Sequence, residues 1–274
     1  MTTVSARLLE VPYHLGRRGV DVGAGPERLA TTVPQLGDRH RIEIDRTPAC
    51  EIEGSFAVLR ATATAVANVK RSGAVPLVFA GNCMTAVAAC ANPTTTRLGV
   101  VWLDAHGDFH TPETTHSGYL DGMALAMLTD ACWYTLLRAV PGFAPISPEQ
   151  VLFVGGHALD AGEGARMRAA GMTVLGGGSL KRVQAAIETL AARSDAFYVH
   201  CDLDVLDTGE LTANTWARPG GMTSAALGEV LGAIAARRRI EALAFTAYDP
   251  SCDERGSGPE IVERVLAAAL TRAV

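Results

Sequence analysis

Two short acidic motifs, each directly after an apolar run, are the positions in this chain with the clearest chemistry. One is D-A-H-G-D at residues 104–108, and the other is D-L-D at residues 202–204. Carboxylates and imidazole bind divalent cations, and side chains two residues apart on an extended strand project to the same side. We therefore expect the following side chains to form two convergent ligand sets: Asp104, His106, Asp108, Asp202 and Asp204.

Four carboxylates and an imidazole at one edge of a sheet need compensation, because like charges in a low dielectric repel strongly. Two divalent cations bridged by carboxylates would offset this repulsion and would lower the pKa of a water molecule between them. These residues alone therefore favour a hydrolase with a two-metal site. The alternative is ordinary turn and capping chemistry, since Asp is common in turns.

The elements that must position these motifs follow from the alternation of strand-sized apolar runs with helical patterns. The apolar runs predict strands at Ala6–Pro12, Arg41–Ile44, Val75–Phe79, Leu98–Leu103, Gln150–Val154, Met172–Leu175, Phe197–Cys201 and Glu241–Thr246. The segments between them predict helices at Pro26–Val33, Ser55–Ser72, Met84–Ala91, Gly122–Thr129, Gly162–Ala170, Leu180–Arg193, Thr223–Ala236 and Gly258–Arg272. This pattern predicts an α/β domain with an open, mainly parallel sheet, helices on both faces, and functional groups beyond the carboxyl ends of the strands.

The composition sets limits on location and partners. The chain has 274 residues, 24 Lys+Arg against 29 Asp+Glu, a formal net charge of −5 and 48% apolar residues. We expect one domain over residues 1–274, with neither a nucleic-acid nor a membrane partner, because no basic run or bilayer-length apolar run occurs. The six cysteines show no CxxC spacing, and the first residues lack a secretory pattern. Both features favour reduced thiols and a cytoplasmic location.

The two acidic motifs belong to a longer pattern. Together with Thr111-Pro112, Ser117-Gly118 and the N-terminal Arg18-Gly19-Val20, they resemble the ureohydrolase family of arginase, agmatinase and formiminoglutamase. The resemblance spans nearly the whole chain and implies a three-layer α/β/α fold around an eight-stranded, mostly parallel sheet. It also implies a dinuclear manganese site whose bridging hydroxide attacks a guanidino or amidino carbon. The metal ligands that it implies are Cys83, Asp104, His106, Asp108, Asp202 and Asp204.

Cys83 is a departure from that family, which usually has a histidine at this ligand position. A thiolate is softer than imidazole and favours zinc or iron over manganese. Cys83 could instead be a small buried residue, or a nucleophile whose pKa a helix N-terminus lowers. The substitution and the run at residues 108–115 resemble a hydrolase of the same family that acts on Nω-hydroxy-L-arginine in D-cycloserine biosynthesis and releases ornithine and hydroxyurea.

The resemblance also implies residues for the substrate's amino-acid end. Thr115, Ser117 and Asp160 match the family's pattern, and His110 stands where asparagine is usual. Each has an ordinary alternative, as a loop hydroxyl, a solvated histidine or, for Asp160, a helix cap.

Two further departures from the family's pattern concern the residues near the guanidino group of the substrate. Asp121 replaces the family's proton-shuttling histidine, so Asp121 or His110 would assist proton transfer while Asp108 orients the hydroxide. The glutamate that pairs with a guanidinium is missing, and Thr246 or Ala247 falls there. A less basic head group, such as a hydroxyguanidine, is therefore favoured.

The function expected from these residues is hydrolysis of Nω-hydroxy-L-arginine to ornithine and hydroxyurea, with two divalent metal ions. Manganese is the expected metal, with zinc or iron as alternatives because of Cys83. Arginine, agmatine, formiminoglutamate and peptidyl arginine stay open as substrates, and a homo-oligomer is compatible with the resemblance. The alternative from another class is a metal-binding scaffold that has lost catalysis.

Overall fold

A parallel eight-stranded sheet runs through the protein. The computed structural model describes residues 2–3, 5–33, 39–45, 48–177 and 179–272. All neighbouring strands of the sheet pair in parallel, which confirms the expected fold class. In spatial order the strands are β5 (Arg39–Arg41), β2 (Ala6–Val11), β6 (Val75–Ala80), β11 (Arg239–Thr246), β10 (Ala196–Asp202), β7 (Leu98–Asp104), β8 (Val151–Gly155) and β9 (Thr173–Gly176).

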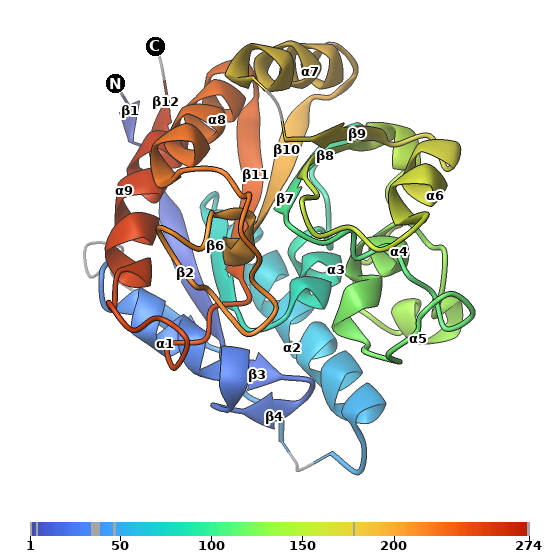
Figure 1. Cartoon of the computed structure of the whole chain (residues 1–274). Coiled ribbons are helices and arrows are strands. Elements are labelled where there is room, and N and C mark those ends of the chain that lie inside the picture. Colours follow the sequence, from blue (N-terminus) through green and yellow to red (C-terminus); the bar gives the residue numbers. More distant parts are fainter. Residues whose placement is uncertain (1, 4, 34–38, 46–47, 178, 273–274) are drawn as a thin grey trace.

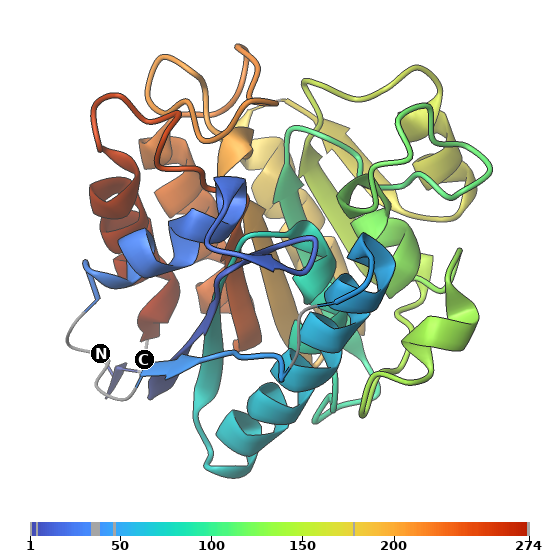
Figure 2. The same cartoon turned by 90° about the horizontal axis from the view of Figure 1, so that it is seen from below.

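Helices cover both faces of this sheet (Figures 1 and 2). One layer consists of α1 (Gly25–Ala30), α7 (Leu180–Arg193), α8 (Ser224–Arg237) and α9 (Gly258–Leu270). The other consists of α2 (Glu51–Arg71), α3 (Ala86–Ala89) and α4 (Ala124–Leu128), while α5 (Tyr134–Leu137) and α6 (Glu163–Ala169) lie near the β8–β9 edge. Successive residues of a strand point to opposite faces of the sheet and pack in the two apolar cores between sheet and helices. Trp102, for example, packs in one core and Leu103 in the other.

The order of the central strands explains where a site can form. After β6 the chain skips two strand positions to make β7, and β10 and β11 later fill that gap. Four neighbouring strands, β6, β11, β10 and β7, therefore end at the same edge. Such a change in strand order at the carboxyl edge is where open α/β sheets bind ligands.

Some boundaries differ from those expected. The edge strand β5 ends at Arg41, whereas the sequence predicted a strand over Arg41–Ile44. Charge explains the difference, because Arg39 and Arg41 reach the buried Glu10 of β2, with Arg41 at 3.3 Å. Short pairings β1 (Thr2–Thr3) with β12 (Thr271–Arg272) and β3 (Tyr13–His14) with β4 (Arg17–Arg18) were not predicted. None of the helices within the described residues has the length and apolar character needed to cross a bilayer.

A buried ion pair stabilises the opposite, amino-terminal end of the sheet. Lys70 Nζ lies 3.1 Å from Glu241 Oε1, and both side chains are almost fully buried. The backbone N–H and the hydroxyl of Thr94 donate to the same carboxylate at 2.7 and 2.8 Å. Burial would raise the pKa of Glu241, but Lys70 and Thr94 outweigh it and hold that pKa below its usual value.

We predict that Glu241→Gln lowers the free energy of unfolding by about 3 kcal/mol, because it leaves the Lys70 ammonium buried without its counter-charge. Urea unfolding measures this loss. Glu188→Gln is the matched control, since its ion pair with Arg237 is exposed and is expected to contribute less than about 1 kcal/mol. Equal stabilities for the two variants would contradict the prediction.

Candidate active site

A cavity of about 770 Å³ opens at the carboxyl edge of the four central strands. The segments that follow β6, β7 and β10 all contribute to its lining. Both acidic motifs of the sequence reach it, together with the loop after β7. Among the residues that line the cavity are Cys83, His106, Asp108, Asp121, Asp202 and Asp204.

The two acidic motifs meet across neighbouring strands. His106 Nδ1 lies 3.2 Å from Asp204 Oδ2 and 3.7 Å from Asp104 Oδ1. These three residues offer ligand atoms within 4.8 Å of one another, close enough to hold one metal ion. Trp102 Nε1 donates a hydrogen bond to Asp104 Oδ2 at 2.9 Å and thereby orients that carboxylate. Hydrogen bonds to Asp104 and Asp204 outweigh burial and raise the pKa of His106 to about 12.

Turns, and not the extended strands expected from the sequence, bring each motif together. β7 ends at Asp104, and Asp108 has a left-handed backbone with φ +49°. β10 ends at Asp202, and Leu203–Val205 form a 3₁₀ turn, η6. Asp202 also caps this turn by accepting a hydrogen bond from the backbone N–H of Asp204 at 2.8 Å. The capping alternative is thus present at the same residue that lines the cavity.

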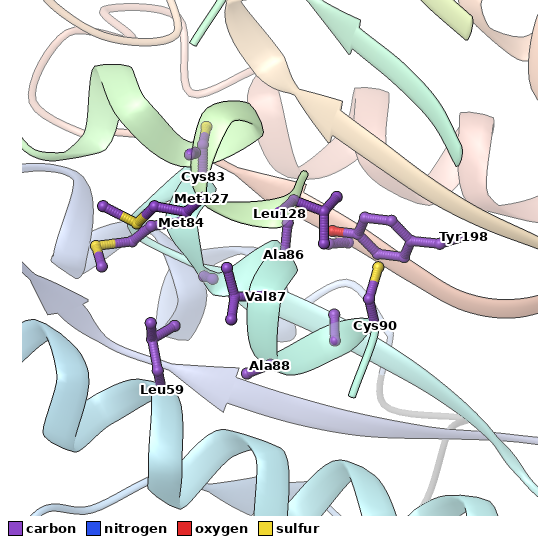
Figure 3. Packing of buried hydrophobic residues seen from close by; sticks show 14 of the residues in the cluster. Leu59, Cys83, Met84, Ala86, Val87, Ala88, Cys90, Met127, Leu128 and Tyr198 are labelled. Carbon is purple, nitrogen blue, oxygen red and sulfur yellow. The ribbon is translucent and has the colours of Figure 1, made fainter. Parts of the chain in front are cut away.

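Cys83 lies against the second acidic motif. Its Sγ is 3.0 Å from Asp202 Oδ2 and 3.2 Å from the Thr246 hydroxyl. Figure 3 shows Cys83 at one end of the buried apolar layer, with its sulfur directed away from Val87 and Leu59. Although β11 separates β6 from β10, the short turn after β6 carries the sulfur over the end of β11 to reach Asp202.

A buried hydrogen-bonded chain continues from Cys83 into the sheet. Thr246 Oγ1 is 3.3 Å from His200 Nε2, and the Tyr198 hydroxyl is 3.0 Å from His200 Nδ1. His200 also stacks on Trp102 with ring centroids 3.7 Å apart. Burial lowers the pKa of His200 to about 3, so its ring is neutral. His200 was not among the residues predicted from the sequence, although its position two residues before Asp202 on a buried strand places it on the same face.

The alternative in which Cys83 is a nucleophile with a lowered pKa finds no support in the surroundings of this thiol. Burial, together with the nearby carboxylates, first among them Asp202, raises the pKa of this thiol well above its usual value. The helical segment after it is also short, with η3 at Cys83–Thr85 and α3 only four residues long. Burial and the neighbouring carboxylates both oppose ionisation of this thiol, which disfavours the free nucleophile.

The donor set suits divalent cations. Asp108 Oδ2 is buried and has no hydrogen-bond partner among the described residues. Burial and then neighbouring carboxylates raise the pKa of both Asp108 and Asp202 well above the usual range. An orphaned carboxylate oxygen within a cluster of like charges is the arrangement that bound dications stabilise.

Asp121 stabilises the turn after β6 by accepting three hydrogen bonds. Its Oδ2 accepts from Asn82 Nδ2 at 2.7 Å and from the Cys83 backbone N–H at 3.1 Å, and its Oδ1 accepts from the Met84 N–H at 2.9 Å. Both oxygens are thus engaged in holding the turn that carries Cys83. This is a different task from the proton transfer that the sequence suggested for Asp121.

The residues expected at the substrate's amino-acid end line the outer cavity. His110, Thr115, Ser117 and Asp160 all contribute, and His110 Nε2 lies 3.0 Å from Asp160 Oδ2. Thr246 is fully buried beneath Cys83, while the neighbouring Ala247 lines the cavity.

Glu163 is a structural residue that the sequence analysis missed. Its buried carboxylate accepts from the backbone N–H groups of Phe109 and Asp160, at 3.0 and 3.2 Å. It thereby links the loop after β7 to the segment that carries Asp160. A carboxylate in the first turn of a helix was the available signal.

Comparison with known proteins agrees with this geometry. The model of the arginase family matches residues 5–273. The chain belongs to the arginase family. It is therefore a hydrolase that acts on the C–N bonds of linear amidines, and its substrates are small guanidino-type molecules.

Two relatives of this chain are named for different activities. The chain is 29% identical to the arginase of Bacillus caldovelox, over 94% of this chain and 95% of that protein. It is 37% identical to the N(omega)-hydroxy-L-arginine amidinohydrolase of Streptomyces lavendulae, over 57% of this chain and 54% of that protein. The native structure of the Bacillus caldovelox arginase superposes with a TM-score of 0.87 and 25% identity, covering 100% of both chains.

We predict that Asp121→Ala lowers the free energy of unfolding by about 2 kcal/mol, because it leaves three donors around Cys83 without their acceptor. Chemical denaturation measures the loss. Asp160→Ala, which removes an exposed carboxylate, is expected to change stability by less than about 0.5 kcal/mol. Unchanged stability with abolished turnover in Asp121→Ala would instead support the proton-transfer role.

Proposed function

We propose that this arginase-family chain hydrolyses Nω-hydroxy-L-arginine to ornithine and hydroxyurea. The observation that carries the proposal is the sulfur of Cys83 among the carboxylates, 3.0 Å from Asp202. The similarity to the Streptomyces lavendulae N(omega)-hydroxy-L-arginine amidinohydrolase supports it. Thr246 or Ala247 stands where the resemblance implies a glutamate that pairs with a strongly basic guanidinium, and Ala247 lines the cavity.

Six side chains are proposed to hold two divalent cations. His106, Asp104 and Asp204 form one compact group, and Cys83 lies against Asp202. When bound, the cations supply Lewis acidity and lower the pKa of water. Manganese is the proposed metal, and the thiolate would increase the affinity for zinc or iron. The six proposed ligands are Cys83, Asp104, His106, Asp108, Asp202 and Asp204.

The chain's own residues then orient the reactants. Asp108, a proposed ligand whose buried Oδ2 has no partner in the described structure, is also proposed to orient the attacking water. Thr115, Ser117 and the His110–Asp160 pair are proposed to bind the amino-acid end of the substrate. Asp121 or His110, which both line the cavity, is the proposed proton carrier for the leaving nitrogen.

Arginine is the second candidate substrate. The Bacillus caldovelox arginase matches nearly the full length of this chain, whereas the hydroxyarginine enzyme matches 57% of it. The two candidates differ in the leaving product, urea or hydroxyurea, and in the basicity of the head group that the cavity must bind.

We predict that the manganese-loaded protein releases hydroxyurea from Nω-hydroxy-L-arginine with a kcat/KM at least about tenfold above that for urea release from arginine, a difference of about 1.4 kcal/mol. Chromatographic separation of urea from hydroxyurea, with agmatine and formiminoglutamate in the same panel, measures this ratio. Faster release of urea from arginine would refute the substrate assignment. Inertness on the whole panel with less than one metal per chain would favour the scaffold.

The ligand role of Cys83 has its own test. We predict that cobalt-loaded protein shows a thiolate-to-metal absorption band in the near ultraviolet, and that Cys83→Ser loses this band and about one metal equivalent. Cys90→Ser is the control, because Cys90 is equally buried and lies outside the residues that line the cavity. A band that survives Cys83→Ser would exclude the sulfur as a ligand.

A further inference from the structure

Three aromatic side chains from separate segments line the same cavity, and the proposed reaction has so far given them no role. Tyr119 lies in the loop after β7, Trp216 in the loop after η6, and His14 ends β3. The rings of Tyr119 and Trp216 are 5.2 Å apart at an interplanar angle of 30°. We name this half-buried pair, Tyr119 and Trp216, the aromatic wall.

His14 holds the wall in place. Its ring meets Tyr119 edge-on at 6.1 Å and Trp216 edge-on at 6.3 Å. Its Nδ1 lies 2.9 Å from Asp21 Oδ2, and its Nε2 lies 3.2 Å from the Tyr119 hydroxyl. An ionised carboxylate only accepts, so Nδ1 carries a hydrogen and the Nε2 of a neutral ring accepts from Tyr119. Both the ring and the hydroxyl of Tyr119 are therefore oriented.

The wall is also fixed relative to the carboxylate cluster. The backbone N–H of Trp216 donates to Asn214 Oδ1 at 2.9 Å, and Asn214 Nδ2 donates to Asp204 Oδ2 at 3.3 Å. On the other side, burial and then the charges of Asp121 and its neighbours raise the pKa of Tyr119, so its ring stays neutral. Asn214 thus connects the segment that carries Trp216 to the proposed ligand Asp204, and both rings line the same cavity as this carboxylate.

Most acidic groups of the cavity outside the proposed ligands are already engaged. Asp121 accepts from three donors, Glu163 accepts from two backbone N–H groups, and Asp160 pairs with His110. Glu51 also lines the cavity and is exposed. Beside these engaged carboxylates, the rings of Tyr119 and Trp216 give the cavity an apolar, aromatic part of its lining.

We propose that the aromatic wall binds the flat C–N head group of the substrate by stacking, and so selects for planar, delocalised groups. This inference rests on the proposed function, because it assigns recognition of the same reacting group. Aromatic faces attract flat π-systems and cations, and they do so for a head group of reduced basicity that a carboxylate would bind weakly. Tyr119 and Trp216 are thus specificity-determining residues, and His14 is a positioning residue.

The experiment compares two ligands that share the amino-acid end and cannot be hydrolysed in this way. L-Citrulline carries a flat head group, whereas L-norleucine carries none. Isothermal titration of the manganese-loaded protein measures both. Trp216→Leu is expected to weaken citrulline binding about fivefold and norleucine binding less than about twofold, while Trp216→Phe keeps most of the citrulline affinity. Equal weakening of both ligands, or unchanged citrulline binding, would overturn the proposal.

A head group without the amino-acid end separates this inference from the proposed function. Methylguanidine is titrated while tryptophan fluorescence is followed in a Trp133→Phe chain, which keeps the fully buried Trp102 and the cavity residue Trp216. Quenching that weakens in Tyr119→Leu is expected, and absence of quenching contradicts the wall. If methylguanidine quenches but neither amino acid binds, the proposed amino-acid substrate is wrong and the wall stands.

Discussion

Mutual repulsion among buried carboxylates is the constraint around which this site is arranged. Asp104, Asp108, Asp202 and Asp204 lie within a few residues of two neighbouring strand ends, and all are buried. The surrounding hydrogen bonds satisfy only part of their charge, since Asp108 Oδ2 has no partner in the described structure. The remaining charge makes the cluster suited to dications, and together with burial, the larger cause, it raises the pKa of the Cys83 thiol.

The two ends of strand β11 carry residues with different tasks, stability at one end and the candidate site at the other. The amino-terminal end of β11 carries the buried pair of Lys70 and Glu241, in which opposite charges compensate each other within the protein. The carboxyl-terminal end of the same strand carries Thr246, which contacts Cys83. The close-packed sheet limits how far the carboxylates at its carboxyl edge can separate, although they repel one another. Their negative charge can therefore remain uncompensated within the protein.

Contacts among the loops determine which side chains line the cavity. Asp121 holds the turn of Cys83, and Glu163 links the loop after β7 to the segment of Asp160. His14, Tyr119 and Trp216 come from three separate segments, yet they form one packed group. Family membership accounts for the sheet and its acidic edge, whereas the proposed selection of the head group rests on these loop contacts.

The sequence by itself determined the eight parallel strands and the two acidic motifs, because apolar runs covered on both faces have a strong local pattern. It could not fix the edge strand β5, where the pairing of Glu10 with Arg39 and Arg41 decides the register. It placed Cys83, Asp121 and Thr246 near the site, but their tasks depend on partners 37 to 163 residues away. Such long-range contacts, like the aromatic wall, have no periodicity in sequence, so only the tertiary structure decided them.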